Sequence, residues 1–262
     1  MEEANQMTDI RRTVRERYAG IAQKGSGCCS QSSCGEGRES DSLRIGYTLE
    51  DLGEVPEGAD LGLGCGTPLL CADVREGMTV LDLGSGAGFD AFLAARKVGK
   101  GGRVIGVDMT PEMIAKARDN ARKAKADNVE FRLGEIENLP VADRSVDVVI
   151  SNCVLNLSPV KPRVLAETFR VLKPGGRIAI SDVVARTGLP EEIRRDPELY
   201  AGCMGGAETI GRLEGILNEI GFEEVRITPR DESRSFISSW APGTDIALWV
   251  VSAMIEGKKP EL

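Results

Sequence analysis

Short apolar runs alternate with amphipathic stretches through the middle of the chain. The apolar runs predict strands over residues 78–84, 103–109, 129–134, 145–154 and 177–184. Between them, hydrophobic residues recur at helical spacing over residues 89–99, 111–126 and 162–173. Pro111 opens the second of these helices, and Pro174-Gly175-Gly176 ends the third. Strands that alternate with helices in this way predict an α/β fold with a mostly parallel, doubly wound sheet.

The two ends of the chain carry a weaker pattern. Ile10, Val14 and Tyr18 stand at helical spacing and predict an amphipathic helix over residues 1–22, followed by a polar Gly/Ser-rich stretch. Residues 45–73 and 198–207 show little periodicity and are expected to form a connector and a linker. A helix over 207–221 and strands over 223–228 and 248–257 are expected to complete the sheet. The expected parts are an N-terminal arm at 1–72, a Rossmann-like core at 73–186 and a C-terminal α+β extension at 187–262.

A glycine-rich turn follows the first predicted strand. The turn reads Asp82-Leu-Gly84-Ser-Gly86-Ala-Gly88, and the second strand ends in another acid, Asp108. Glycines at this place let the backbone approach a nucleotide, and an acid after the second strand can hold a ribose hydroxyl pair. The GxGxG spacing differs from the GxGxxG of dinucleotide sites and favours S-adenosylmethionine, which has no pyrophosphate for a third glycine to accommodate. A tight turn without a ligand is the alternative, but the acid, the turn and the strand order together favour a nucleotide site.

Composition narrows the chemistry further. The chain has 262 residues, a formal net charge of -8 and no histidine. The missing histidine excludes Ser-His-Asp and Cys-His catalysis, HExxH metal helices and mixed Cys/His zinc sites. The acidic balance, without a Lys/Arg-rich stretch, argues against nucleic acid as a partner. With no signal-like start and no long apolar run, we expect a cytoplasmic protein without a membrane anchor.

The cysteines are the most informative reactive side chains. There are seven of them, an odd number that is expected to stay reduced in the cytoplasm. Cys153 follows Asn152 at the carboxyl end of a predicted central strand, where such sheets bind ligands, although a lone buried cysteine can also be a packing side chain. Cys65 and Cys203 lie in glycine-rich, non-periodic stretches instead of predicted core elements. Without CxxC pairs, three convergent thiols suit a three-coordinate thiophilic centre such as trivalent arsenic better than tetrahedral zinc.

Four core segments have a recognisable form: VLDLGSGAG, VIGVDMTPEMIAKAR, GEIENLPVADRSVDVVISN and RVLKPGGRIAISD. They resemble the class I S-adenosylmethionine-dependent methyltransferases. The resemblance implies a Rossmann-like class I methyltransferase fold with S-adenosylmethionine as cofactor. The residues that it assigns to the cofactor are Asp82, Gly84, Ser85, Gly86, Asp108, Met109, Glu135, Ile136 and Asn152. In that assignment the glycine turn and Asn152 lie near the methionine part, Asp108 holds the ribose, and Glu135 and Ile136 face the adenine.

Further motifs extend the resemblance from about residue 18 to 255, namely RYAGIAQKGSGCC, LGLGCGTP, SNCVLNLSP, FRVLKPGGR and AGCMGGA. With them the chain resembles the arsenite methyltransferases. The resemblance implies that arsenic is bound by Cys65, Cys153 and Cys203, and that an N-terminal cysteine takes part in a redox step. The candidates for that redox step are Cys28, Cys29 and Cys34. It also implies repeated methylation of arsenite delivered by glutathione or a similar thiol, with thioredoxin or a thiol as reductant.

Some features depart from this pattern or leave alternatives open. Leu63 stands where animal and algal members carry tyrosine, so an aromatic contact with the cofactor is open at that position. A class I methyltransferase for a quinone precursor, a sterol or another small acceptor would use the same core with structural cysteines, although an aromatic content of 4% offers such a ligand little to stack on. A non-catalytic, thiol-rich arsenic-binding protein is the other alternative. Cys71 is expected to be dispensable, Trp240 and Trp249 to serve packing, and a monomer to suffice.

Overall fold

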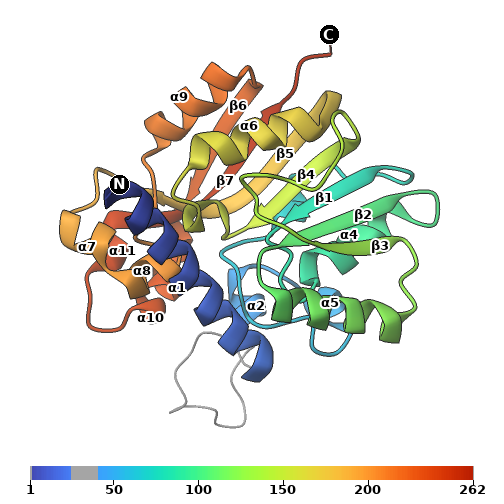
Figure 1. Cartoon of the computed structure of the whole chain (residues 1–262), viewed down its shortest axis with the longest axis horizontal. Helices are drawn as coiled ribbons and strands as arrows, with labels where there is room; N and C mark the ends of the chain where they lie inside the picture. The colour runs from blue at the N-terminus through green and yellow to red at the C-terminus, as the bar shows by residue number, and fades with distance from the viewer. Residues whose placement is uncertain (1, 25–40, 262) are drawn as a thin grey trace.

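A seven-stranded sheet in the order β3-β2-β1-β4-β5-β7-β6 forms the centre of the computed structural model, which describes residues 2–24 and 41–261 (Figure 1). The strands are β1 (Thr79–Leu83), β2 (Arg103–Asp108), β3 (Val129–Leu133), β4 (Val146–Asn152), β5 (Leu172–Ala185), β6 (Glu223–Arg230) and β7 (Val250–Lys258). Within the described residues, β7 is the strand that pairs antiparallel with its neighbours, while β1 to β5 pair in parallel. This topology confirms the predicted α/β class with a mostly parallel, doubly wound sheet.

Helices cover both faces of this sheet (Figure 1). In chain order they are α1 (Glu2–Lys24), α2 (Asp41–Ile45), α3 (Leu49–Glu54), α4 (Phe89–Val98), α5 (Pro111–Ala124), α6 (Lys161–Val171), α7 (Glu191–Arg195), α8 (Pro197–Ala201), α9 (Ile210–Ile220), α10 (Arg234–Trp240) and α11 (Ile246–Trp249). Successive strand residues point to opposite faces. Val80 packs in a cluster with residues of α4 and α5, whereas Leu81 packs with residues of α6 and α9. Both strand faces are therefore buried, as the near-continuous apolar runs predict.

The segments without clear periodicity are more structured than the sequence predicts. The connector at 45–73 contains α3, which Thr48 and Asp51 begin with a reciprocal capping box. The linker at 198–207 begins inside α8, where the Asp196 side chain accepts the backbone N–H groups of Glu198 and Leu199. The last strand begins at Val250, two residues later than predicted, because the helical turn α11 precedes it. Capping side chains, which act over three or four residues, build these short elements without a periodic pattern.

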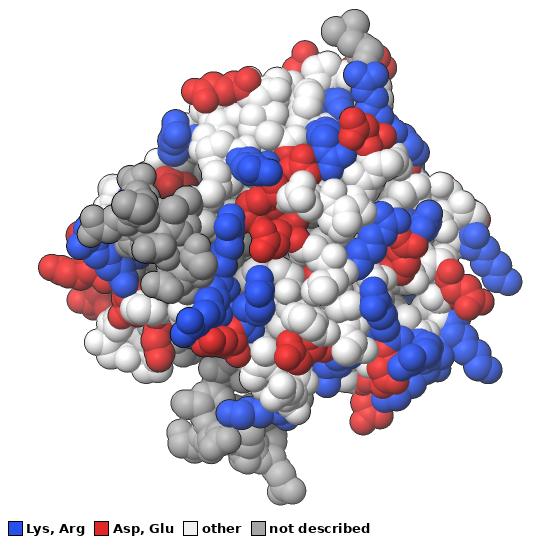
Figure 2. Space-filling view, viewed as in Figure 1, with Lys and Arg blue, Asp and Glu red and all other residues white. Residues whose placement is uncertain are grey.

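Helix α1 lies across the two halves of the molecule. It packs against α5 on one side and α8 on the other. Arg11 pairs with Glu137 at 3.1 Å and Arg15 with Glu135 at 3.7 Å, so both join α1 to the loop after β3. On the face shown in Figure 2, acidic and basic side chains are interspersed. In the part of the chain that the structure describes, no helix is long and apolar enough to cross a bilayer.

Candidate active site

A cavity of about 1810 Å³ opens at the carboxyl ends of the central strands. The predicted site residues that line it are Asp82, Gly84, Ser85, Gly86, Asp108, Met109, Ile136, Asn152, Cys153 and Cys203. Cys65 is fully buried behind this wall. Glu135 is not among the lining residues and pairs instead with Arg15, while its neighbour Glu137 faces the cavity. Cys28, Cys29 and Cys34 lie outside the described residues.

The glycine turn after β1 has a backbone that requires glycine. Gly84 has φ +65°, and a Cβ atom added there would lie 2.4 Å from a methyl group of Val154. The N–H groups of Gly84 and Ser85 both donate to the carbonyl of Val107, at 2.7 and 3.0 Å. Asp108 closes the turn, because its carboxylate accepts the N–H of Gly86 at 3.0 Å and that of Thr110 at 2.8 Å. The glycine backbone of the turn and the Asp108 carboxylate therefore lie together at the cavity wall.

Three carboxylates gather beside this turn. Burial, followed by the charges of Asp90 and Asp108, raises the pKa of Asp82 well above its ordinary value. Burial raises the pKa of Asp90 to about 6, and burial also raises that of Asp108. Buried acids that repel one another are stabilised by a nearby cation. S-adenosylmethionine carries a sulfonium and an ammonium group, so its charge fits this cluster.

Ser85 gives a second indication that a ligand fits here. Its side chain is buried, and its Oγ atom has no hydrogen-bond partner among the described residues. A buried hydroxyl without a partner costs free energy, and such atoms occur where a ligand completes the site. The turn, the three acids and this hydroxyl therefore fit S-adenosylmethionine.

Asn152 joins the cofactor side of the cavity to the thiols. Its Oδ1 atom accepts the backbone N–H of Cys65 at 2.9 Å. Its Nδ2 atom donates to the Gly66 carbonyl at 2.8 Å, the Tyr47 hydroxyl oxygen at 2.9 Å and the Asp90 carboxylate at 3.2 Å. Asn152 therefore fixes the position of the Cys65 loop, a role that sequence analysis did not assign.

If Cys65 binds arsenite, as the resemblance implies, Asn152→Ala is expected to weaken that binding about 10-fold, because it leaves the Cys65 N–H and the Gly66 carbonyl without their partner. Equilibrium dialysis with arsenite measures this effect. Asn128→Ala is the matched control, since Asn128 also donates to two carbonyls, those of Ala95 and Gly99, but does not line the cavity. Equal arsenite affinity of Asn152→Ala and the parent would show that Asn152 does not hold the thiol loop.

The loop that carries Cys65 approaches β5 very closely. A Cβ atom on Gly66 would lie 2.2 Å from the Ser181 Oγ atom, so glycine is required next to the cysteine. The Cys65 Sγ atom lies 3.6 Å from the same hydroxyl, and the Cys65 carbonyl accepts the Ser252 Oγ–H at 2.7 Å. The glycines of the GCG motif thus bring this sulfur against the sheet.

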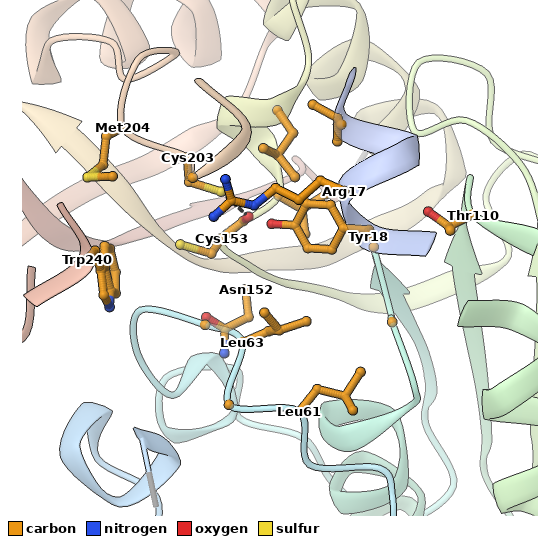
Figure 3. Close-up of a pocket in the computed structure, with 18 of the residues that line it drawn as sticks. Arg17, Tyr18, Leu61, Leu63, Thr110, Asn152, Cys153, Cys203, Met204 and Trp240 are labelled. Carbon is orange, nitrogen blue, oxygen red and sulfur yellow. Dashed lines mark hydrogen bonds between the residues drawn. The ribbon is translucent and has the colours of Figure 1, made fainter. Parts of the chain in front are cut away.

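The other two cysteines have backbones in the left-handed region. Cys153 has φ +60° and Cys203 has φ +67°. This region costs a non-glycine residue of the order of 1 kcal/mol, and such residues cluster at functional sites. The Cys203 thiol donates to the Cys153 carbonyl, and Figure 3 shows the two side chains beside each other near Asn152. Three segments far apart in the sequence thus meet at the thiols.

The two neighbouring thiols influence the protonation of Cys153. Hydrogen bonds with Cys203 and then Cys65, together with burial, raise the pKa of Cys153 well above its ordinary value. Cys153 is therefore a thiol at neutral pH in the absence of a ligand. Cys71 is exposed and lies apart from this group, as expected for a dispensable cysteine.

Several residues around the thiols had no functional assignment from the sequence. Trp240 was expected to serve packing; it packs on Phe236 at 5.3 Å between ring centroids, and it also lines the cavity (Figure 3). Tyr18 of α1 lines the same cavity as Leu63 and so supplies an aromatic ring to a wall where Leu63 does not. Asp90 stands two residues after the last glycine of the motif, so its position was a usable signal. Tyr18 and Trp240 gave no such signal because only tertiary packing brings them to the cavity.

Comparisons with known proteins agree with this geometry. A family model described as a methyltransferase domain matches residues 74–221. The arsenite methyltransferase of Halobacterium salinarum is 55% identical over 96% of this chain, which spans 67% of that protein. The chain belongs to the family of S-adenosylmethionine-dependent arsenite methyltransferases.

Other arsenite methyltransferases are similar over shorter regions. The human arsenite methyltransferase is 42% identical over 63% of this chain, which spans 46% of the human protein. A crystal structure of an arsenic(III) S-adenosylmethionine methyltransferase from Chlamydomonas reinhardtii aligns with a TM-score of 0.62 and 31% identity, covering 86% of this chain and 75% of that one. These findings confirm the predicted class I methyltransferase fold and the predicted cofactor. The chain spans from about half to two thirds of the length of the curated relatives cited.

Proposed function

We propose that this chain transfers methyl groups from S-adenosylmethionine to trivalent arsenic bound by Cys65, Cys153 and Cys203. The observation that carries the proposal is the meeting of the thiols beside the glycine turn and its acids: Cys153 and Cys203 line the cavity, and the Cys65 Sγ atom lies within 4.8 Å of that of Cys153. Two of the three cysteines keep a strained backbone in this position. Strain that packing maintains at a ligand cavity supports a functional role.

Arsenite can exchange its three hydroxyl groups for these thiols without a base to remove the thiol protons. Each arsenite hydroxyl leaves as water with the proton of the thiol that replaces it, so three As–S bonds form and three water molecules leave. The raised pKa of Cys153 does not oppose this exchange, since a neutral thiol reacts and no charge accumulates. From the sequence alone, arsenite binding is expected to weaken as the pH falls, because thiolates are the ligands. Because the Cys153 thiol is protonated in the free protein, we propose that its exchange with an arsenite hydroxyl changes little around neutral pH.

The cofactor supplies a methyl group on a sulfonium, and arsenic with three sulfur ligands keeps a lone pair that can accept it. The chain orients the two reactants, an effect worth up to about 7 to 11 kcal/mol in model reactions.

Methylation oxidises arsenic by two electrons. We propose that a pair of cysteines returns them as it forms a disulfide, which glutathione, thioredoxin or a similar thiol then reduces. Cys28, Cys29 and Cys34 are the candidates in this chain.

Release of S-adenosylhomocysteine tests the acceptor directly. We expect release that depends on arsenite and a thiol reductant, and none with quinol or sterol acceptors. Release with a quinol but not with arsenite would favour the class I alternative, and arsenic binding without any release would favour a sequestering protein.

A further inference from the structure

A buried carboxylate faces two of the three thiols. Asp182 of β5 is 1% exposed, and one of its oxygens lies within 4.8 Å of the Sγ atoms of both Cys65 and Cys153, which are equally close to each other. Asp182 is therefore the acid next to the position where arsenic would sit.

The buried Asp182 carboxylate accepts several hydrogen bonds. Its Oδ1 atom accepts the Asn156 Nδ2–H at 2.8 Å and the Val183 N–H at 2.7 Å, and its Oδ2 atom accepts the Asn156 N–H at 3.2 Å. Burial raises the pKa of Asp182 to about 6, which these hydrogen bonds and the Lys161 ammonium limit. The three N–H groups that donate to the carboxylate favour its ionised form.

A positive charge develops on arsenic, beside this carboxylate, during methylation. Arsenic with three thiolate ligands is neutral and donates its lone pair to the methyl carbon. The As–C bond forms, the C–S bond breaks with its electron pair on sulfur, and arsenic passes from As(III) to a four-substituted As(V) centre with one positive charge. A fixed negative group beside arsenic stabilises that charge more strongly in the transition state than in the ground state.

We propose that Asp182 is the charge partner of arsenic, with its carboxylate placed to stabilise the positive charge that arsenic acquires on methylation. The proposal rests on the proposed function and adds to it a residue that is not a thiol. It predicts that arsenite binding and methyl transfer respond differently to the charge at Asp182, since neutral arsenic gains little from the carboxylate.

Lys161 offers an independent way to change the same field. Its side chain is 6% exposed, its Nζ atom donates to the Ser158 carbonyl at 3.2 Å, and its ammonium and the Asp182 carboxylate each favour the charged form of the other. The ammonium therefore offsets part of the carboxylate's potential. Its removal also raises the pKa of Asp182, so the field at the thiols becomes more negative only at a pH well above that pKa, where the carboxylate stays ionised.

We expect Asp182→Asn to slow methyl transfer from preloaded arsenite about 10- to 30-fold in single turnover. The arsenite affinity, measured by equilibrium dialysis without cofactor, should stay within about 3-fold of the parent. At a pH well above the pKa of Asp182, where the carboxylate is ionised in both proteins, Lys161→Met should change the single-turnover rate in the opposite direction, to about 2- to 3-fold above the parent. Asp147→Asn is the matched control, because Asp147 also accepts a backbone N–H, that of Thr79, but lies near the amino end of β4.

The outcomes separate the two proposals. A folded Asp182→Asn variant with the parental rate and affinity overturns the inference, and so does parallel loss of affinity and rate, which indicates a purely structural role. If Asp182→Asn does not fold, the direction of Lys161→Met decides: a faster rate supports the inference, and an unchanged or slower rate overturns it. Failure of the parent protein itself to methylate arsenite contradicts the proposed function instead.

Discussion

Replacing Cys153 by serine lowers the rate of arsenite methylation about 100-fold, because a hydroxyl is a poor ligand for soft trivalent arsenic and two thiols cannot complete the site. The change is nearly isosteric and keeps the left-handed backbone of the residue, so we expect the fold to persist. The measurement is arsenite methylation in the presence of thiol and S-adenosylmethionine, with thermal unfolding as a check on the fold.

Cys71→Ser is the matched control for this prediction. Cys71 is exposed and does not line the cavity, so this variant should methylate arsenite at the parental rate. If Cys153→Ser methylated both arsenite and its monomethylated trivalent product like the parent, the three-thiol site would be wrong.

Gly84→Ala lowers the affinity for S-adenosylmethionine about 100-fold, since the added methyl group meets Val154 and the backbone at φ +65° becomes strained. Either the turn moves or Val154 is displaced, and Val154 follows Cys153 directly. Isothermal titration calorimetry with S-adenosylmethionine measures the loss.

Gly215→Ala provides the comparison. Gly215 lies in the middle of α9 with open space around the position of a Cβ atom, so alanine there should leave cofactor affinity unchanged and stabilise the fold by about 0.5–1 kcal/mol. Parental cofactor affinity of Gly84→Ala would contradict the position we give the cofactor.

The regular core was predictable because its signals are local. Val80 and Leu81 belong to one apolar run, and Pro111 marks the start of α5 at the first helical position. Each depends on residues within a few positions along the chain, which periodicity and capping rules describe. The class I topology follows once these elements are placed, since strand and helix alternate.

The site was predictable only in part. The glycine turn and Cys153 stand at strand ends, where the fold itself places ligands. Glu135 and Glu137 differ by two positions in one loop and both pair with arginines of α1, but only Glu137 also lines the cavity, which no spacing along the chain could predict. Asp182 lies in β5, whose sequence predicts a buried strand and gives no sign of a functional residue. Its partner Asn156 lies in a 3-10 turn after β4, so no sequence spacing connects the two.

The central claim concerns the atom that receives the methyl group. The most direct measurement is chromatography with mass spectrometry of arsenic species after incubation with arsenite, a thiol and S-adenosylmethionine that carries a deuterated methyl group. We predict methylated arsenic in which every arsenic-bound methyl group carries the label. Recovery of unmethylated arsenite alone, with the cofactor intact, would contradict the account.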